Sequence, residues 1–209
     1  MLSIGYDIGS SSIKCSIINL EDGKQLAQGF YPPDEMKILS PAPSWAEQNP
    51  GDWWDYLKIL THQLFRDYKI DGSLVKSIGI SYQMHGLVLV DENQKVLRPS
   101  IIWCDSRAVE IGNQAFNQIG QDNCLQHLLN SPGNFTASKL RWVRENEPDI
   151  YSKIYKMMLP GDFIAMKLTG EISSTVSGLS EGIFWDFKND SISNQLLAYY
   201  DIDERILPK

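Results

Sequence analysis

The chain has 209 residues, of which 43% are hydrophobic and 22% charged, and its formal net charge at pH 7 is −7. This composition excludes a disordered protein and allows one sizeable core, or one domain with an incomplete second one. The negative charge argues against nucleic acid or an anionic membrane as a partner, because both attract basic surfaces. No apolar stretch approaches the roughly 20 residues that span a bilayer, so we expect a cytoplasmic protein.

The first fourteen residues predict a strand followed by an anion-binding turn. Apolar residues alternate from Leu2 to Ile8, which is the period of a strand with two different faces. A Gly-Ser-Ser-Ser turn follows, whose N–H groups and hydroxyls can hold a phosphate, and a second strand begins at Ile13. The residues of this predicted phosphate site are Gly9, Ser10, Ser11, Ser12 and Lys14, with Asp7 on its flank. The alternative is a serine-rich β-turn with a lysine at its edge.

The next fifty residues predict a third strand, a loop and a long helix. An Asp-Gly turn at 21–24 favours a hairpin into a strand over 25–31, which makes three antiparallel strands in succession. The prolines from Pro32 to Pro50 indicate a surface loop, in which we expect Trp45 to be exposed. Asn49 and Pro50 are typical of a helix start, and apolar residues at helical spacing continue to Tyr68.

The remainder predicts short strands and then mostly helices. We expect a buried strand over 75–81, short apolar strands over 87–90, 95–97 and 101–103, and a helix from Asp105 or Ser106 to Gly120. Further helices are predicted over 122–129, 136–146, 148–155 and 161–168, with a short strand at 157–159. The last forty residues predict loops, a strand near 183–187 and a helix at 192–199.

The three cysteines indicate thiols rather than a covalent framework. Cys15, Cys104 and Cys124 are odd in number and widely spaced, which suggests neither a disulfide framework nor a zinc site. We therefore expect buried thiols.

Two polar motifs directly follow predicted strands, where a ligand site on a mixed sheet is expected. Gln83-Met84-His85-Gly86 offers an amide, an imidazole and close backbone approach, which suit a polyol. Trp103-Cys104-Asp105-Ser106-Arg107 offers an aromatic face for a sugar and a carboxylate that an arginine can steady. The alternatives are a turn with a structural histidine, and a strand-ending tryptophan followed by an aspartate helix cap.

Taken in order, these motifs resemble a known family. Asp7 to Lys14 resembles the first phosphate loop of the sugar kinase, hexokinase, Hsp70 and actin superfamily. With the segment 43–50, the two polar motifs, and the segments 135–142 and 159–163, it resembles the FGGY family of carbohydrate kinases over essentially the whole chain. The two polar motifs look most like those of xylulokinases. The resemblance implies an α/β fold, a ribonuclease H-like domain with a mixed β-sheet, flanking helices and a mostly helical insertion.

The resemblance also implies an activity and its ligands. It implies ATP-dependent phosphorylation of a sugar hydroxyl, D-xylulose to D-xylulose 5-phosphate, with ATP and Mg²⁺ as cofactors. Asp7 matches the acid that orients the magnesium, and the loop from Gly9 to Ser12 matches the contacts with the nucleotide phosphates. The residues that match sugar contacts are Gln83, Met84, His85, Trp103 and Asp105.

Two departures from the family pattern limit what the resemblance implies. The family's general base is an Asp in a Gly-Gly-x-Asp segment that would lie beyond Lys209, so we expect no catalytic residue in residues 1–209 and no kinase activity from them alone. These residues match the N-terminal sugar-binding domain without the nucleotide-binding domain, and apolar surface exposed there would allow a homodimer. The run 175–180 replaces the Asp-x-Ser-x-Ala usual in xylulokinases. A kinase for ribulose, gluconate or glycerol, and a non-catalytic sugar-binding module, therefore remain alternatives.

Overall fold

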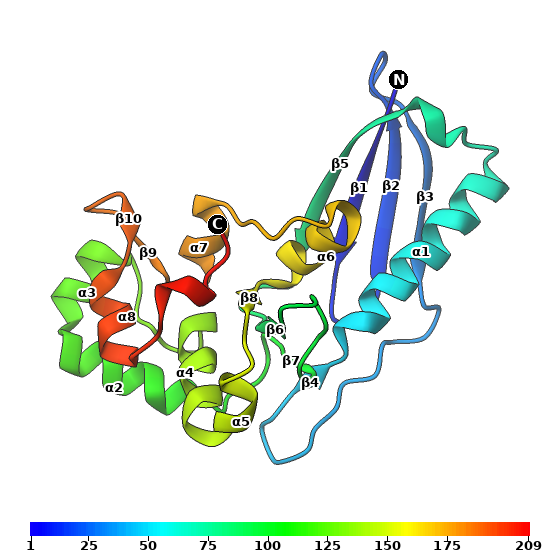
Figure 1. The fold of residues 1–209 in the computed structure, drawn as a ribbon. Coiled ribbons are helices and arrows are strands. Elements are labelled where there is room, and N and C mark those ends of the chain that lie inside the picture. The colour runs from blue at the N-terminus through cyan, green and yellow to red at the C-terminus, as the bar shows by residue number, and fades with distance from the viewer.

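The computed structural model describes residues 1–209 and divides the chain into a sheet-based half and a helical half (Figure 1). The main sheet has the strand order β3-β2-β1-β5. Its strands are β1 (Leu2–Ile8), β2 (Ile13–Asn19), β3 (Gln25–Tyr31) and β5 (Val75–Tyr82). Because β1 pairs antiparallel with β2 and parallel with β5, the predicted mixed sheet is confirmed.

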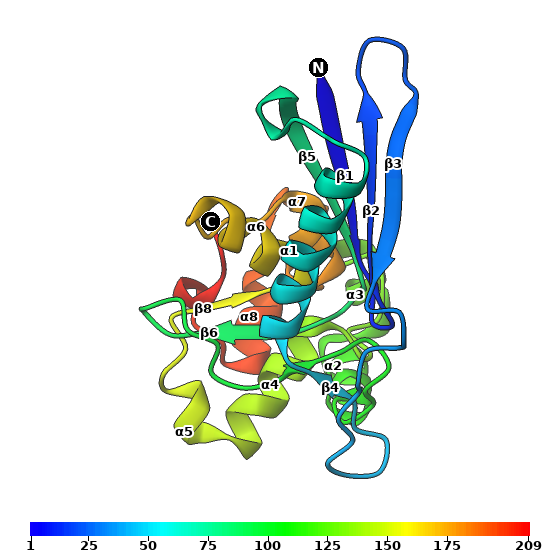
Figure 2. The ribbon, with the colours of Figure 1, turned by 90° about the vertical axis from the view of Figure 1, so that its right-hand side faces the viewer.

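Helix α1 (Pro50–Asp67) covers one face of this sheet (Figure 2). It begins as predicted, with the Asn49 side chain accepting a hydrogen bond from the N–H of Gly51 at 3.1 Å. Alternate strand residues such as Ile8 and Ile17 are fully buried against Trp53 and Leu60 of the helix. The register of the sheet is fixed because one face of the strands is buried against the apolar side of α1.

Four short strands lie between the two halves: β4 (Glu47–Gln48), β6 (Val88–Val90), β7 (Ser100–Ile101) and β8 (Lys156–Met158). Along β6 and the residue before it, the two faces contribute to different cores. Val88 and Val90 belong to the hydrophobic cluster of the sheet half, whereas Leu87 and Leu89 belong to that of the helical half. Since side chains alternate along a strand, one short segment can join two cores, and the loops beside it lie at their boundary.

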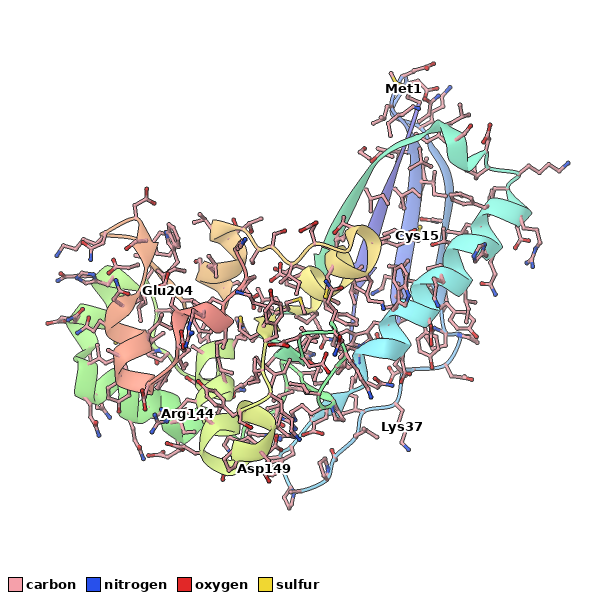
Figure 3. The ribbon with its side chains drawn as sticks, in the orientation of Figure 1. Met1, Cys15, Lys37, Arg144, Asp149 and Glu204 are labelled. Carbon is pink, nitrogen blue, oxygen red and sulfur yellow. The ribbon has the colours of Figure 1, made fainter.

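Helix α6 (Pro160–Thr169) packs beside β5, and the other helices build the helical half. These are α2 (Val109–Ile119), α3 (Gln121–His127), α4 (Thr136–Asn146), α5 (Pro148–Tyr151), α7 (Val176–Glu181) and α8 (Asn194–Tyr200). The short strands β9 (Trp185–Asp186) and β10 (Ser191–Ile192) and the 3₁₀ turns η1 (Gly72–Leu74) and η2 (Glu204–Ile206) complete the chain. Figure 3 shows Arg144 and Asp149 in the helical half and Cys15 in the sheet half.

Four predicted elements differ from the structure. The strand expected over 95–97 is only an isolated bridge between Val96 and Val90. The helix expected from Asp105 or Ser106 begins only at Val109, because the Asp105 carboxylate holds the backbone of Arg107 in a turn. The helix expected to reach 155 ends at Tyr151, because the chain then pairs with β6 as strand β8. Residues 176–181, expected to be a loop, form α7 with Thr175 as its cap.

Trp45 and Cys104 also differ from expectation. Trp45, expected to be exposed, packs edge-on against Trp142 with ring centroids 5.0 Å apart, and the Arg107 guanidinium lies 3.9 Å from its ring. Cys15 and Cys124 are buried as predicted, but Cys104 is exposed. No helix in the structure has both the length and the apolar character needed to cross a bilayer.

Candidate functional site

The turn between β1 and β2 presents a row of free donors. None of the backbone N–H groups from Gly9 to Ser12 donates a hydrogen bond to another group of the chain. Gly9 is needed because a Cβ there would lie 2.9 Å from the carbonyl oxygen of Ser12. The N–H of Met36 holds the turn by donating to the Ser11 carbonyl at 2.8 Å. Free N–H groups in a tight turn form a concavity that suits an anion.

Asp7 and Lys14 lie on the strands beside this turn. The Lys14 ammonium lies 3.1 Å from the Asp7 carboxylate, whose side chain keeps 43% of its exposure. The hydroxyl of Ser81 donates to the other carboxylate oxygen at 3.1 Å. Asp7, Lys14 and Ser81 border a hollow of about 630 Å³ on the sheet face opposite α1. Gln28 and Phe30 also line this hollow. A half-exposed carboxylate near a phosphate site is the protein ligand that Mg²⁺ commonly uses together with phosphate oxygens.

The loop after β5 is bonded to the end of β1. The N–H of Gln83 donates to the carbonyl of Ile8 at 2.9 Å, and its side-chain amide donates to Gln48 at 3.3 Å. Gln48 in turn donates to the carbonyl of Ser10 at 2.7 Å. The side-chain carbonyl of Gln83 is buried without a partner, while Met84 is 55% exposed. An orphaned acceptor beside an exposed apolar side chain fits a ligand that carries hydroxyl groups.

Trp103 connects the second polar motif to the same turn. Its indole N–H donates to the hydroxyl of Ser10 at 3.1 Å, and the residue keeps 48% of its exposure. The sequence motifs at 9–12, 83–86 and 103–107 therefore meet in space. An exposed indole face next to the turn can pack on the apolar side of a sugar ring or chain.

Asp105 lies beneath this surface and is fully buried. Its carboxylate accepts from the N–H of Ala46 at 2.6 Å and from the Arg107 guanidinium, with the shortest contact at 2.7 Å. Arg107 also contacts Glu47 at 2.7 Å. Through these contacts Asp105 helps to hold the loop that carries Trp103. A direct contact between Asp105 and a sugar stays a prediction.

Helix α4 supplies a buried cation that joins the two polar loops. The Lys139 ammonium donates to the backbone carbonyls of His85 at 2.7 Å and Ile102 at 3.1 Å. Burial lowers the pKa of Lys139 to about 8, because desolvation disfavours the charged amine. One side chain thus fixes the loop after β5 relative to the loop after β7.

Sequence reasoning missed several residues of this site. Gln48, Lys139 and Glu181 received no role, although each bonds to a loop of the site. Lys139 lies in the segment 135–142 that carries part of the family resemblance, and this was the signal available for it. Glu181 lies just beyond the run that departs from the xylulokinase pattern, and only the folded chain brings it to His85.

Comparison with known proteins identifies a family for the chain. The family model described as the N-terminal domain of the FGGY family of carbohydrate kinases matches residues 2–209. The xylulose kinase of Escherichia coli (strain K12) is 33% identical over 205 residues, a match that covers 98% of this chain and 41% of that protein. The chain therefore spans about two fifths of the length of this curated relative.

Solved structures show the same fold. A xylulose kinase from Brucella ovis superposes with a TM-score of 0.91 at 30% identity and covers 100% of this chain and 43% of that one. A gluconate kinase from Lactobacillus acidophilus shares the fold, with a TM-score of 0.88 at 23% identity. The match covers 100% of this chain and 41% of the gluconate kinase chain. The family match over almost every residue and these likenesses lead to one conclusion: the chain belongs to the FGGY family of carbohydrate kinases.

Proposed function

We propose that this chain is the sugar-side domain of a kinase that transfers the γ-phosphoryl group of ATP to a hydroxyl of D-xylulose. The observation that carries the proposal is the hydrogen bond from the Trp103 indole to the Ser10 hydroxyl at 3.1 Å. It joins a turn with free N–H donors to a surface with an exposed indole, an exposed methionine and an orphaned amide oxygen. A phosphate and a polyol bound there would be neighbours, which phosphoryl transfer requires.

D-xylulose is the substrate we favour for two reasons. Two relatives that are 33% and 32% identical over 98% of this chain are named xylulose kinases. The amide of Gln83, the imidazole of His85 and the indole of Trp103 suit the hydroxyl groups of a neutral ketose.

ATP and Mg²⁺ fit the residues of the turn. The N–H groups of Gly9 to Ser12 would hold phosphate oxygens, and Asp7 would hold the metal or its water. Magnesium would supply neutralisation of the phosphate charge at this position. Lys14 adds a positive charge at the edge of the same turn.

Calorimetric titration of the 209-residue chain tests the sugar part of this proposal. We expect D-xylulose to bind with measurable heat, and Trp103→Ala to weaken that binding about tenfold, because an aromatic contact is lost. Tyr155→Ala, at an exposed aromatic residue outside the site, is the matched control and should bind as the unsubstituted chain does. Equal binding by Trp103→Ala, or tighter binding of glycerol or gluconate than of D-xylulose, would contradict the proposal.

Amide NMR tests the phosphate part. Addition of Mg²⁺ and ATP should shift the amide resonances of Gly9 to Ser12, and Gly9→Ala should reduce the shifts because the added Cβ displaces the Ser12 carbonyl. Shifts confined to other parts of the chain would rule out the turn as the phosphate site.

A further inference from the structure

Two carbonyl groups of the turn between β1 and β2 are held by donors from other parts of the chain. The carbonyl of Ser10 accepts from the side-chain amide of Gln48 at 2.7 Å, and that of Ser11 accepts from the N–H of Met36 at 2.8 Å. The peptide bonds of the turn are trans, so each carbonyl and the N–H of the next residue point in opposite directions. The two bonds therefore turn the N–H groups of Ser11 and Ser12 away from the donors that hold the carbonyls.

The side chain of Gln48 is fixed in one orientation by its partners. It is 2% exposed, and its oxygen accepts from the indole N–H of Trp53 at 3.2 Å and from the amide of Gln83 at 3.3 Å. An indole N–H can only donate and a backbone carbonyl can only accept, so the amide nitrogen of Gln48 has to face Ser10. Trp53 is fully buried in the hydrophobic cluster of the sheet half. The direction of the Ser11 N–H is thus set from the core.

The backbone on both sides of Gln48 is also held. Strand β4 pairs antiparallel with β7, where Gln48 lies opposite Ser100, and the next residue, Asn49, caps α1. An anion gains most from donors that already point toward it, because binding then requires no reorganisation. A Ser10 carbonyl free to rotate would instead bring a partial negative charge toward the anion. Gln48 prevents this rotation from a position outside the turn.

We propose that Gln48 is a positioning residue for phosphoryl transfer, which holds the Ser10 carbonyl and so aims the Ser11 N–H at a phosphate oxygen of ATP. The proposal rests on the proposed function, because it assumes that the turn binds the phosphates. It assigns a role to a residue outside the turn and outside the residues matched to ligand contacts in sequence.

Gln48→Met tests this role in the 209-residue chain. Methionine has a similar volume but makes none of the three hydrogen bonds of the glutamine side chain. Gln126→Met, at an exposed glutamine of α3, is the matched control and should behave as the unsubstituted chain does. The readout is the change in the amide resonances of the turn when Mg²⁺ and ATP are added.

We expect the affinity of Gln48→Met for Mg²⁺ and ATP to fall about tenfold, which corresponds to one lost hydrogen bond to a charged group. At saturation, the shift of the Ser11 amide should be largely lost. The shift of the Ser12 amide should persist, because the N–H of Met36 still holds the Ser11 carbonyl. A side chain with only a structural role would weaken both shifts alike.

Deuterium exchange of the side-chain NH₂ groups tests the same contact without a substitution, and it decides the matter if Gln48→Met does not fold. In the unsubstituted chain, the NH₂ group of Gln48 should exchange about tenfold or more slowly than that of Gln126, because it is buried and bonded to Ser10. Equally fast exchange would show that Gln48 does not hold the turn.

An unaltered Ser11 shift in Gln48→Met, or equal losses at Ser11 and Ser12, overturns this inference alone. Shifts of the unsubstituted chain that leave residues 9–12 unaffected overturn the proposed phosphate site, and the role of Gln48 with it.

Discussion

At the scale of single residues, buried charge decides how the candidate site is built. Asp105 and Arg107 lie within the chain with side chains that are 0% and 1% exposed, and Glu47 completes the group at 7%. A buried ion pair costs desolvation free energy, which is recovered only when its hydrogen bonds are complete. Here Arg107 contacts both Asp105 and Glu47, and Asp105 also accepts from the N–H of Ala46, while Nη1 of Arg107 is buried without a partner. These contacts can hold the backbone that carries Trp103.

Asp105→Asn should be strongly destabilising. The amide NH₂ would face the donors that now bind the carboxylate, and Arg107 would lose one of its two carboxylate partners. We expect the free energy of unfolding to fall by about 3–5 kcal/mol, measured by urea denaturation. Asp67→Asn, in an exposed pair with Arg66, is the control and should leave the midpoint almost unchanged. Equal midpoints for the two variants would show that the buried network does not hold this loop.

Asp162 should make stability depend on pH in mildly acidic solution. Burial raises the pKa of this carboxyl to about 6 from its ordinary 3.8. Between these values the native state therefore binds more protons than the unfolded state. The contribution of the Asp162 carboxyl to the free energy of unfolding is full below about pH 4 and is lost as pH rises through 6. A shift of this size corresponds to about 3 kcal/mol.

Asp162→Asn tests this pH dependence, because the amide oxygen can still accept from the N–H of Leu159, now 3.2 Å from the carboxylate. The difference in unfolding free energy between variant and parent should grow in favour of the variant between about pH 4 and 6. Urea denaturation over that range measures it. A difference that is constant with pH would mean that Asp162 titrates normally in the folded chain.

At the scale of elements, two glycines set how closely α6 approaches the sheet and the loop after β5. A Cβ at Gly161 would lie 2.1 Å from the ring of Tyr82, and one at Gly86 would lie 2.4 Å from the ring of Pro160. The start of α6 therefore rests directly on the end of β5 and on the loop that carries His85. A larger residue at either position would force these elements apart.

Gly161→Ala should destabilise the chain by about 1–3 kcal/mol, since the Tyr82 ring has to move to admit a methyl group. Gly79→Ala, in the same strand as Tyr82 but with no atom within 4 Å of the added Cβ, is the control. Thermal unfolding of both variants measures the difference. A Gly161→Ala variant as stable as the control would mean that α6 can shift at little cost.

At the scale of the whole molecule, the candidate site lies where two hydrophobic cores meet. Ile102, just before Trp103, belongs to the core of the sheet half, and Leu87, just after Gly86, belongs to that of the helical half. Lys139 from α4 then bonds to both loops. A ligand at this boundary contacts loops that are anchored in both cores, so its binding should stabilise the chain as a unit.

D-xylulose should therefore raise the thermal midpoint of the 209-residue chain. A ligand at 100 times its dissociation constant adds about 2.7 kcal/mol, which for a chain of this size corresponds to roughly 5–10 °C. Differential scanning calorimetry with D-xylulose, and with gluconate at the same concentration as the comparison, measures the effect. A rise with gluconate and none with D-xylulose would favour a sugar-acid kinase.

The sequence by itself determined the parts whose signals are local. Strand alternation predicts β1 and β2, Asn49 and Pro50 predict the start of α1, and the segment 136–146 is helical as expected. These succeed because period and capping depend on residues only a few positions apart.

Only the tertiary structure decided the burial of Asp105, the packing of Trp45 and the contact between Glu181 and His85. Glu181 and His85 are 96 positions apart, and Asp105 accepts from a backbone N–H 59 positions away. No local pattern encodes such pairs, because they form only when both cores are assembled and bring the loops between them together. The chain thus specifies its elements locally, while the environment of each site residue depends on the packing of the whole fold.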